Sequence, residues 1–428
     1  QVRDYVREKG QDASNVRLFG QEKMGTTWSI CKMNMLLHGI PDADIRQQDT
    51  LREPQHKDET NQLRRFDRVL ANPPFSQNYS RKEMEFPGRF AVWMPEKGKK
   101  ADLMFVQHML AVLKADGKMA TVMPHGVLFR GGEEREARRH FIEHGWLEAV
   151  IGLPAGLFYG TGIPACVLVM NKYGARERGH VVFINADRDY REGKAQNFLR
   201  PEDISRIVHA YRALAGGDIE EIPAYGRRVP VTEIAAEDYN CNIRRYVDNA
   251  PPPEPHDVRA HLHGGVPVAE VDALGRYWRN YPALRARCFQ PRAGEASYAD
   301  FAPELAERRA IAGVVGSDAS LAAAHGEFMG RLDDWWAELR PELEALAPTR
   351  NADGQWVQTG NVYALRRALL ASVVDAFAGN TLLTTHQVRG ALARWLGEMK
   401  ADLKSIAASG WGAELIPDAD ILESQFPE

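Results

Sequence analysis

The residues best suited to chemistry lie in the sequence DRVLANPPF of residues 67–75, where an apolar segment runs into an amide, two prolines and an aromatic ring. Because Pro73 and Pro74 cannot donate to a sheet ladder, they hold the chain in extended and turn geometry. Asn72 is then presented at the carboxyl edge of a strand, where open α/β sheets place their ligands. Asn72 and the Pro73 carbonyl can both accept from an exocyclic amine, while Phe75 can stack on a flat base. Asn-Pro also opens ordinary turns, so a simple loop is the alternative at this point.

Two acidic residues end earlier strand-like segments. Glu22 follows a strand expected at Asn15–Gly20 and precedes a helix expected at Thr26–His38. A carboxylate there can accept from both hydroxyls of a ribose, although an acidic residue that complements a helix dipole is the alternative. Asp49 follows another short segment and can accept from an adenine amino group or simply cap a turn. Because the strand ends of a doubly wound sheet line one crevice, we expect Glu22, Asp49 and Asn72 to lie together.

The composition is that of an ordinary globular protein. With 428 residues, 44% of them hydrophobic, the chain can bury a sizeable core and is expected to form two domains or one domain with a large extension. A net charge of −4 excludes a global attraction for nucleic acid, so any DNA affinity must come from a local patch or a partner. Four widely spaced cysteines without a CxxC pattern indicate reduced thiols in a cytoplasmic protein, not a zinc site. No apolar run reaches membrane-spanning length.

The segments after residue 75 are expected to complete an α/β sheet. Expected helices are Leu103–Leu113, Glu133–His144 and Arg200–Leu214, and expected strands are Met119–Met123, Glu148–Leu153, Ala165–Met170, an edge strand at Val181–Asn185, and short terminal strands at Val231–Ala235 and Tyr239–Tyr246. The basic and aromatic stretch 78–100 is suited to contact DNA or to fill the gap left by an extruded base, with a solvated loop as an equal alternative. Phe158 or Tyr159 is a candidate for a second wall of a base pocket, with core packing as the alternative for at least one of them. His125 is expected to be structural or to contact DNA, not to act as a base.

A proline-rich segment, Pro251–Pro255, divides the chain. We expect a catalytic domain at residues 1–250, a linker with an irregular segment at 251–300, and a mostly helical region at 301–428. The helices expected after the linker are Pro303–Val314, Ala319–Glu344, Ala364–Phe377 and Thr385–Ala407. A stripe of tryptophan and leucine residues in the second of them is typical of a helix core, with partner docking as the alternative.

The sequence also resembles a known family. The tetrapeptide Asn72-Pro73-Pro74-Phe75 is similar to the catalytic motif of DNA N6-adenine methyltransferases. Over residues 1–250, the runs that resemble the modification (M) subunit of type I restriction-modification systems are LFGQEKMGTTWSICKMNMLLHGI, QQDTL, FDRVLANPPFS, VMPHGVLFRGGEERE and LPAGLFYGTGIPACVLVMNK. The resemblance implies an α/β, Rossmann-like methyltransferase sheet with a mostly α-helical C-terminal extension, and S-adenosylmethionine as the methyl donor.

On this resemblance, Glu22 corresponds to the acidic residue that contacts the cofactor ribose and Asp49 to the contact on its adenine side. Asn72, which also borders the cofactor, opens the motif Asn72–Phe75 that holds and stacks a flipped adenine. The implied partners are double-stranded DNA, a specificity subunit that reads the DNA, a restriction subunit and a second M subunit. The resemblance implies that the C-terminal helices bind the specificity subunit. It implies no membrane partner.

One feature of the family does not occur in this sequence. The glycine-rich cofactor loop, of acidic-Pro-x-x-Gly-x-Gly type, is missing, and Gly131-Gly132 and Gly216-Gly217 lie outside any strand-loop-helix setting. Because Gln1 is not a methionine and opens a helical segment, we expect this loop to lie upstream. Two alternatives stay open: a non-catalytic assembly or DNA-clamp subunit with this fold, and a methyltransferase acting on RNA or on a protein amide.

Overall fold

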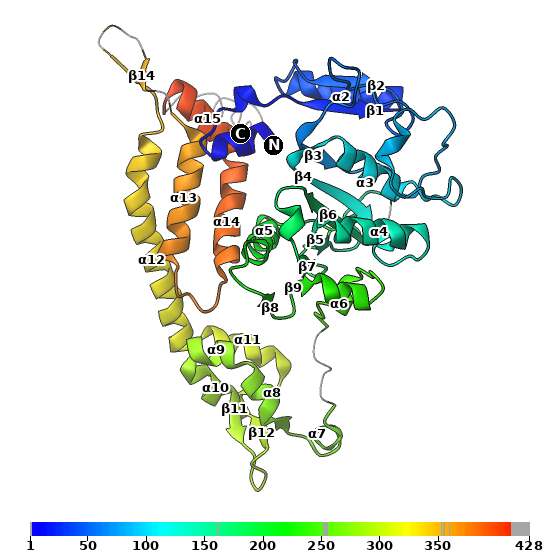
Figure 1. Cartoon of the computed structure of the whole chain (residues 1–428). Helices are drawn as coiled ribbons and strands as arrows, with labels where there is room; N and C mark the ends of the chain where they lie inside the picture. The colour runs from blue at the N-terminus through cyan, green and yellow to red at the C-terminus, as the bar shows by residue number, and fades with distance from the viewer. Residues whose placement is uncertain are drawn as a thin grey trace. The chain divides into compact units, whose positions relative to one another are not determined.

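The structure, a computed structural model, describes residues 2–160, 162–250, 256–351, 353, 356–358 and 360–411. The chain divides into two compact units, Ser14–Ala250 and a second unit made of Gln1–Ala13 with Pro251–Glu428. The first unit contains a seven-stranded sheet with strand order β3-β4-β6-β5-β7-β9-β8 (Figure 1). In that order, the strands are Phe66–Ala71, Leu113–Pro124, Ala165–Asn171, Leu147–Gly152, His180–Asn185, Gly226–Pro230 and Glu221–Ile222. The sheet is mixed, because β3 and β4 are parallel, as are β5 and β7, whereas β6 is antiparallel to both its neighbours.

Helices cover both faces of this sheet. They are α3 (Asp102–Ala111) and α4 (Glu133–Glu143) on one face and α5 (Pro201–Gly216) on the other. Successive residues of β5 enter different cores, because side chains alternate across a strand. Val150 packs in the larger core with α3 and α4, whereas Ala149 and Ile151 pack in the smaller core with α5. The layered arrangement confirms the predicted α/β class.

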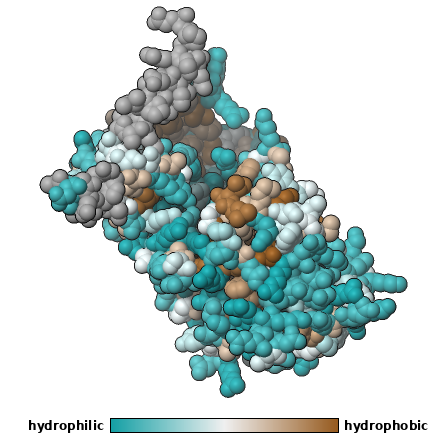
Figure 2. Space-filling model, turned by 90° about the horizontal axis from the view of Figure 1, so that it is seen from above, coloured by the Kyte–Doolittle hydropathy of each residue, from teal (hydrophilic) through white to brown (hydrophobic). Residues whose placement is uncertain are grey.

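A separate two-stranded parallel sheet precedes the main sheet in the chain. It consists of β1 (Phe19–Glu22) and β2 (Asp44–Gln47), joined by α2 (Gly25–Leu37). The helix begins within one residue of the expected Thr26–His38, but none of its residues is buried, and Leu37 is 77% exposed. Figure 2, which looks down on the side where α2 lies in Figure 1, shows hydrophobic residues at the surface among hydrophilic ones. Amphipathic spacing therefore predicted the helix correctly but not its burial.

The second unit joins the first helix of the chain to the C-terminal helices. Within it, α1 (Val2–Glu8) lies against α13 (Val362–Ala376). Tyr363 Oη donates to Asp4 Oδ1 at 2.7 Å, and Lys400 Nζ lies 3.0 Å from Asp4 Oδ2. The compact unit that contains the main sheet runs from Ser14 to Ala250, whereas the expected catalytic domain is residues 1–250.

The other elements of the second unit are mostly helical. They are α7 (Val258–His263), α8 (Val268–Ala273), α9 (Gly275–Asn280), α10 (Pro282–Cys288), α11 (Ile311–Gly316), α12 (Ala319–Glu344), α14 (Thr385–Glu398) and α15 (Lys400–Ser409), with a small sheet β10-β12-β11 (Val266–Pro267, Tyr298–Phe301, Phe289–Pro291) and a pair β13-β14 (Thr349–Arg350, Trp356–Gln358). The helix expected at Ala319–Glu344 has those bounds, and its buried Trp335 and Leu339 pack with α13 and α14. The expected helix Thr385–Ala407 is divided at Met399. The expected linker signal Pro251–Pro255 lies outside the described residues.

Three strand predictions are wrong. Val231–Ala235 lies in helix α6 (Val231–Ala236), and the only regular element within Tyr239–Tyr246 is a short 3-10 turn at Ile243–Arg245. Val181–Asn185 belongs to β7, which is internal and not an edge strand, because β9 pairs with it on the side away from β5. No described helix is long and apolar enough to cross a membrane.

Candidate functional site

The NPPF segment, Asn72–Phe75, follows β3 at the carboxyl edge of the seven-stranded sheet. At this edge Ala71, the last residue of β3, is paired with Thr121 of the parallel strand β4. Asn72 is exposed, and its side chain makes no hydrogen bond within the described residues. The prolines that follow cannot extend the ladder. The Asn72 amide is therefore available to a ligand at the place where the sequence predicted it.

Phe75, three residues after Asn72, belongs to an aromatic pair. The rings of Phe75 and Phe158 are arranged edge to face, with centroids 6.1 Å apart and an interplanar angle of 78°. Phe158 belongs to the connection between β5 and β6, which lies at the same edge because Gly152 at the end of β5 pairs with Cys166 at the start of β6. Tyr159 is 84% exposed. Of the two aromatic candidates, Phe158 is thus the one that contacts the motif; Thr161 of the same turn lies outside the described residues.

Glu22 ends β1 and begins the turn into α2. Its Oε1 accepts the Met24 N–H at 2.8 Å, one residue before the helix starts. This contact matches the alternative role of an acidic residue at a helix N-terminus. Its Oε2 has no hydrogen bond in the part of the chain that the structure describes. Glu22 therefore serves the helix with one oxygen, while the ribose contact predicted for it stays a prediction.

Asp49 follows β2, and both of its carboxylate oxygens are occupied. Oδ1 accepts the amides of Leu51 and Arg52 at 3.0 and 3.2 Å, and Lys23 Nζ lies 2.8 Å from Oδ2. Partial burial opposes the charged form, but the Lys23 contact and the two amides outweigh it and hold the pKa of Asp49 below its usual value. Asp49 thus caps a turn, and a ligand amine that approaches Oδ2 has to displace Lys23.

The three predicted polar residues do not lie on one sheet. Glu22 is the last residue of β1, and Asp49 follows β2, the parallel neighbour of β1. The ion pair between Lys23 and Asp49 links the ends of these two strands. Asn72 follows β3, which is not hydrogen-bonded to β1. The single sheet assumed for these strand ends is therefore not formed, although their roles in binding stay predictions.

Side chains, not backbone pairing, connect the two sheets. His56 Nε2 lies 2.9 Å from the Gly20 carbonyl oxygen of β1, so this ring nitrogen is the donor. The ring of Phe19, at the start of β1, packs against that of Phe66, at the start of β3, with centroids 5.2 Å apart. These contacts attach the β1-β2 layer to the strand that carries the NPPF segment.

His125 comes directly after β4 and is also near the carboxyl edge. Its main-chain amide donates to the Pro164 carbonyl at 3.2 Å, and its buried Nε2 has no hydrogen-bond partner within the described residues. Burial lowers the pKa of this imidazole, so the ring is neutral near pH 7 and a weaker base than usual. The expectation that His125 is structural or contacts DNA, and does not act as a base, stays a prediction.

Sequence reasoning counted Arg89 among the basic residues of the stretch 78–100 that are suited to contact DNA or to lie in a solvated loop, but in the structure it is buried and fixes the turn after Asp49. Arg89 is only 8% exposed, and its guanidinium donates to the carbonyls of Thr50 and Leu51 at 3.2 and 2.6 Å. A lone arginine in a charged loop is usually solvated. The sequence therefore contains little to distinguish it, since the carbonyls it meets are 38 and 39 residues away.

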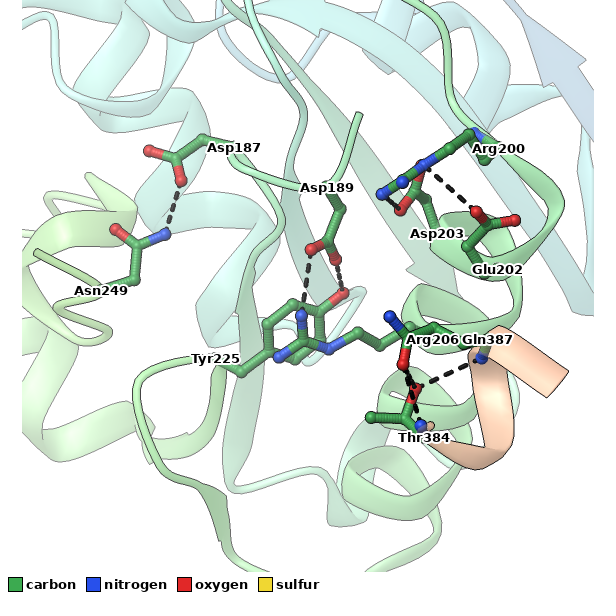
Figure 3. A network of polar contacts seen from close by, with 10 residues as sticks. All are labelled: Asp187, Asp189, Arg200, Glu202, Asp203, Arg206, Tyr225, Asn249, Thr384 and Gln387. Carbon is green, nitrogen blue, oxygen red and sulfur yellow. Dashed lines mark hydrogen bonds and ion pairs between the residues drawn. The ribbon is translucent and has the colours of Figure 1, made fainter. Parts of the chain in front are cut away.

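Asp189 is a buried acid whose partners lie in the same unit. Beyond β7, Asp189 accepts from Tyr225 Oη at 2.5 Å and from Arg206 at 3.0 Å, while the Arg206 guanidinium lies 3.8 Å from the centroid of the Tyr225 ring (Figure 3). Each carboxylate oxygen of Asp189 thus has a partner within the cluster, which joins the segment after β7 to α5 and Tyr225. Among the described residues, no group of three or more histidine, cysteine, aspartate or glutamate side chains could hold a metal ion.

Comparisons with known proteins found a matching family model and several similar chains. A family model described as N-6 DNA methylase matches residues 1–254. The type I restriction enzyme MjaVIII methylase subunit of Methanocaldococcus jannaschii is 33% identical over 258 residues, which cover 57% of this chain and 43% of that protein. The type I restriction enzyme MpnII methylase subunit of Mycoplasma pneumoniae is 29% identical over 262 residues, which cover 59% and 47%. The chain thus spans about half the length of the curated relatives it matches.

A solved structure extends the comparison to the fold. The type I restriction-modification system methyltransferase subunit from Streptococcus thermophilus is 37% identical, with a TM-score of 0.51, over 58% of this chain and 52% of that chain. Together with helices on both faces of a mixed sheet, this likeness confirms the predicted Rossmann-like methyltransferase fold.

Proposed function

Since this chain belongs to the N-6 DNA methylase family, we propose that it is the modification subunit of a type I restriction-modification complex and methylates N6 of adenine in DNA. The observation that carries the proposal is that the unbonded Asn72 amide and the edge-to-face rings of Phe75 and Phe158 come from segments that follow strands at the same edge of the sheet. An amide acceptor and aromatic surface at one sheet edge suit a flipped base with an exocyclic amine.

Asn72 and Pro73 handle the amine of the base. The side-chain carbonyl of Asn72 and the main-chain carbonyl of Pro73 each accept one N–H, which directs the nitrogen lone pair out of the base plane. Phe75 stacks on the ring and fixes its orientation, so that the reacting nitrogen is held in place. The N6–methyl bond forms as the sulfur–methyl bond of the cofactor breaks, and the thioether S-adenosylhomocysteine is the leaving group. The methylated amine is then cationic and acidic enough to give its proton to water, so no strong base is needed, which agrees with the weakened basicity of His125.

The cofactor of the proposed reaction is S-adenosylmethionine, which supplies a methyl group activated by its sulfonium charge. Glu22 fits this cofactor, because its unbonded Oε2 can accept from a ribose hydroxyl. Asp49 would hold the adenine side after Lys23 moves away from Oδ2, and Asn72 borders both ligands. The two carboxylates and the amide thus provide three polar contacts for one nucleoside.

DNA and protein partners complete the proposal. In the segment 78–100, the Lys82 side chain is 84% exposed and the Arg81 guanidinium lies 4.9 Å from the centroid of the Trp93 ring, a combination suited to a phosphate backbone and an unpaired base. Since the net charge of −4 provides no overall attraction, recognition of the DNA belongs to a specificity subunit, held by the C-terminal helices. A second modification subunit and a restriction subunit complete the complex.

The test is transfer of tritiated methyl from S-adenosylmethionine to unmodified duplex DNA by the chain assembled with its specificity subunit. We expect N6-methyladenine in the digested product, detected by mass spectrometry. Parallel reactions with RNA and with protein substrates address the alternative substrates. Cofactor binding by calorimetry without any methyl transfer would support a non-catalytic clamp and contradict the proposed activity.

A further inference from the structure

We propose that Asp102 is a positioning residue for methyl transfer, because it locks the turn that directly follows Phe75 onto the start of α3. The inference rests on the proposed function, since it concerns the residues that hold the target base. It assigns a task to a buried acid that neither the sequence pattern nor the base-handling residues account for.

The contact is a hydrogen bond across the turn. Ser76 has a left-handed backbone conformation, with φ of 55°, which is uncommon for a residue other than glycine. Its N–H donates to Asp102 Oδ1 at 2.8 Å. One residue further, the Gln77 carbonyl accepts the Ala101 N–H at 3.0 Å. Two hydrogen bonds thus fix the exit from the NPPF segment in an otherwise unfavourable conformation.

Asp102 does not act as an ordinary helix cap. It is the first residue of α3, but its carboxylate accepts no amide of its own helix among the described residues. Six of the next eight residues are apolar and five of these six are buried, so α3 is firmly seated in the core. A carboxylate that is 1% exposed on such a helix is a rigid point of attachment for the turn.

The Asp102 carboxylate also belongs to a cluster of charged side chains. Arg130 Nη1 lies 3.9 Å from Asp102 Oδ2 and 3.3 Å from Glu134 Oε1, and Lys100 Nζ lies 2.5 Å from Glu134 Oε2. Two buried acids therefore face two partly exposed cations, and their charges balance. Asp102 Oδ2 itself has no hydrogen bond within the described residues. Replacing this oxygen by an amide nitrogen therefore breaks no existing hydrogen bond, whereas removing the side chain leaves the Ser76 amide without its acceptor.

This difference defines the experiment, which compares Asp102→Asn with Asp102→Ala in the full chain. The matched control is Asp203→Ala, another buried aspartate in the first turn of a helix that accepts a main-chain amide, that of Arg200, at 2.8 Å (Figure 3). Single-turnover methyl transfer is measured in the complex with the specificity subunit. Amide hydrogen exchange of residues 72–79 is measured on the chain alone.

We expect Asp102→Ala to lower the single-turnover rate by about 10- to 100-fold and to speed exchange in residues 72–79, because the turn is released. Asp102→Asn keeps the acceptor and should stay within about threefold of the wild-type rate. Asp203→Ala should leave the exchange of residues 72–79 unchanged. Unchanged exchange in Asp102→Ala, or equal loss of transfer in Asp102→Ala and Asp203→Ala, overturns the inference. If the wild-type complex transfers no methyl group, the proposed function fails, and hydrogen exchange alone decides whether Asp102 holds the turn.

Discussion

The guanidinium of Arg89 donates to Nδ1 of His108 at 2.7 Å inside the core of the first unit, where both side chains are less than 9% exposed. The contact requires a neutral imidazole with its proton on Nε2. The same guanidinium donates to main-chain carbonyls on both sides of it, those of Thr50, Leu51, Glu85 and Phe86. The Arg89 side chain thus joins α3, the turn after Asp49 and the Glu85–Phe86 segment, which follows the NPPF motif in the chain.

Replacing Arg89 by alanine should destabilise the protein strongly. Four carbonyls and one ring nitrogen lose their donor in a buried place, so we expect the free energy of unfolding to fall by at least about 3 kcal/mol, measured by urea unfolding. The free energy of unfolding of Arg89→Lys should lie between those of the wild type and Arg89→Ala, because an ammonium group keeps the charge but cannot reproduce the planar, five-donor guanidinium. The control is Arg52→Ala, whose side chain is 54% exposed and pairs with Glu83 at the surface. An equal loss of unfolding free energy in Arg89→Ala and Arg52→Ala would show that the buried contacts of Arg89 do not stabilise the fold.

The state of His108 should be visible in the pH dependence of stability. Burial and the adjacent Arg89 charge lower the pKa of His108 to about 3, whereas the unfolded imidazole titrates near 6.5. Between these values the unfolded chain binds more protons than the folded one. The stability contributed by the neutral ring is therefore present above about pH 6.5 and is lost as the pH falls, at up to about 1.4 kcal/mol per pH unit.

The measurement compares wild type with His108→Gln, which keeps an acceptor for Arg89 but cannot titrate. Denaturant unfolding at pH 6.5 and pH 4.5 should show a smaller loss of stability in the variant. If both proteins lose the same amount, another group is responsible for the acid sensitivity of this region.

Asn72→Ala should abolish methyl transfer without loss of stability. Because the side chain is exposed and makes no hydrogen bond in the described structure, the free energy of unfolding should change by less than about 0.5 kcal/mol. Transfer should fall by about 100-fold or more, since a preorganised acceptor for the amine is gone. Asn34→Ala, on the exposed α2 helix, is the control for both measurements. A fully active Asn72→Ala variant would be incompatible with the proposed role.

Glu22→Gln separates cofactor binding from helix capping. Glutamine retains the oxygen that accepts the Met24 amide, so the helix should be little affected. The charge that favours hydrogen bonds from ribose hydroxyls is removed, and we expect the Kd for S-adenosylmethionine, measured by calorimetry, to rise by about 10-fold. An unchanged Kd together with a lower melting temperature would indicate that Glu22 serves only α2.

Phe158→Ala should weaken the hold on the flipped base. The variant removes the ring that opposes Phe75, and stacking of a base on an aromatic side chain contributes about 1–3 kcal/mol. The apparent Kd for DNA should rise, or the single-turnover rate should fall, by about 5- to 150-fold. Tyr159→Ala, at a position 84% exposed, provides the comparison. A larger effect of Tyr159→Ala would reverse the assignment of the two rings.

Local patterns were sufficient for some segments, although they gave Val231–Ala235 as a strand and Pro303–Val314 as one helix, whereas the first is helical and the second consists of two short 3-10 turns followed by α11. The helix Ala319–Glu344 was predicted with its observed bounds, because apolar residues recur at helical spacing between its ends. The NPPF segment was placed correctly at a strand end, since prolines stop a ladder whatever surrounds them. The resemblance carried by the NPPF motif and the runs within residues 1–250 predicted the family that the comparisons identify.

Long-range pairing was decided only by the tertiary structure. Whether Val181–Asn185 is an edge strand depends on β9, whose partner residues lie about 45 positions away along the chain. Asp102 and Arg89 look like a helix end and a loop charge in the sequence, yet each binds main-chain groups 26 to 39 residues distant. Composition and periodicity describe neighbours along the chain, whereas a buried charge is defined by the partners that folding brings to it.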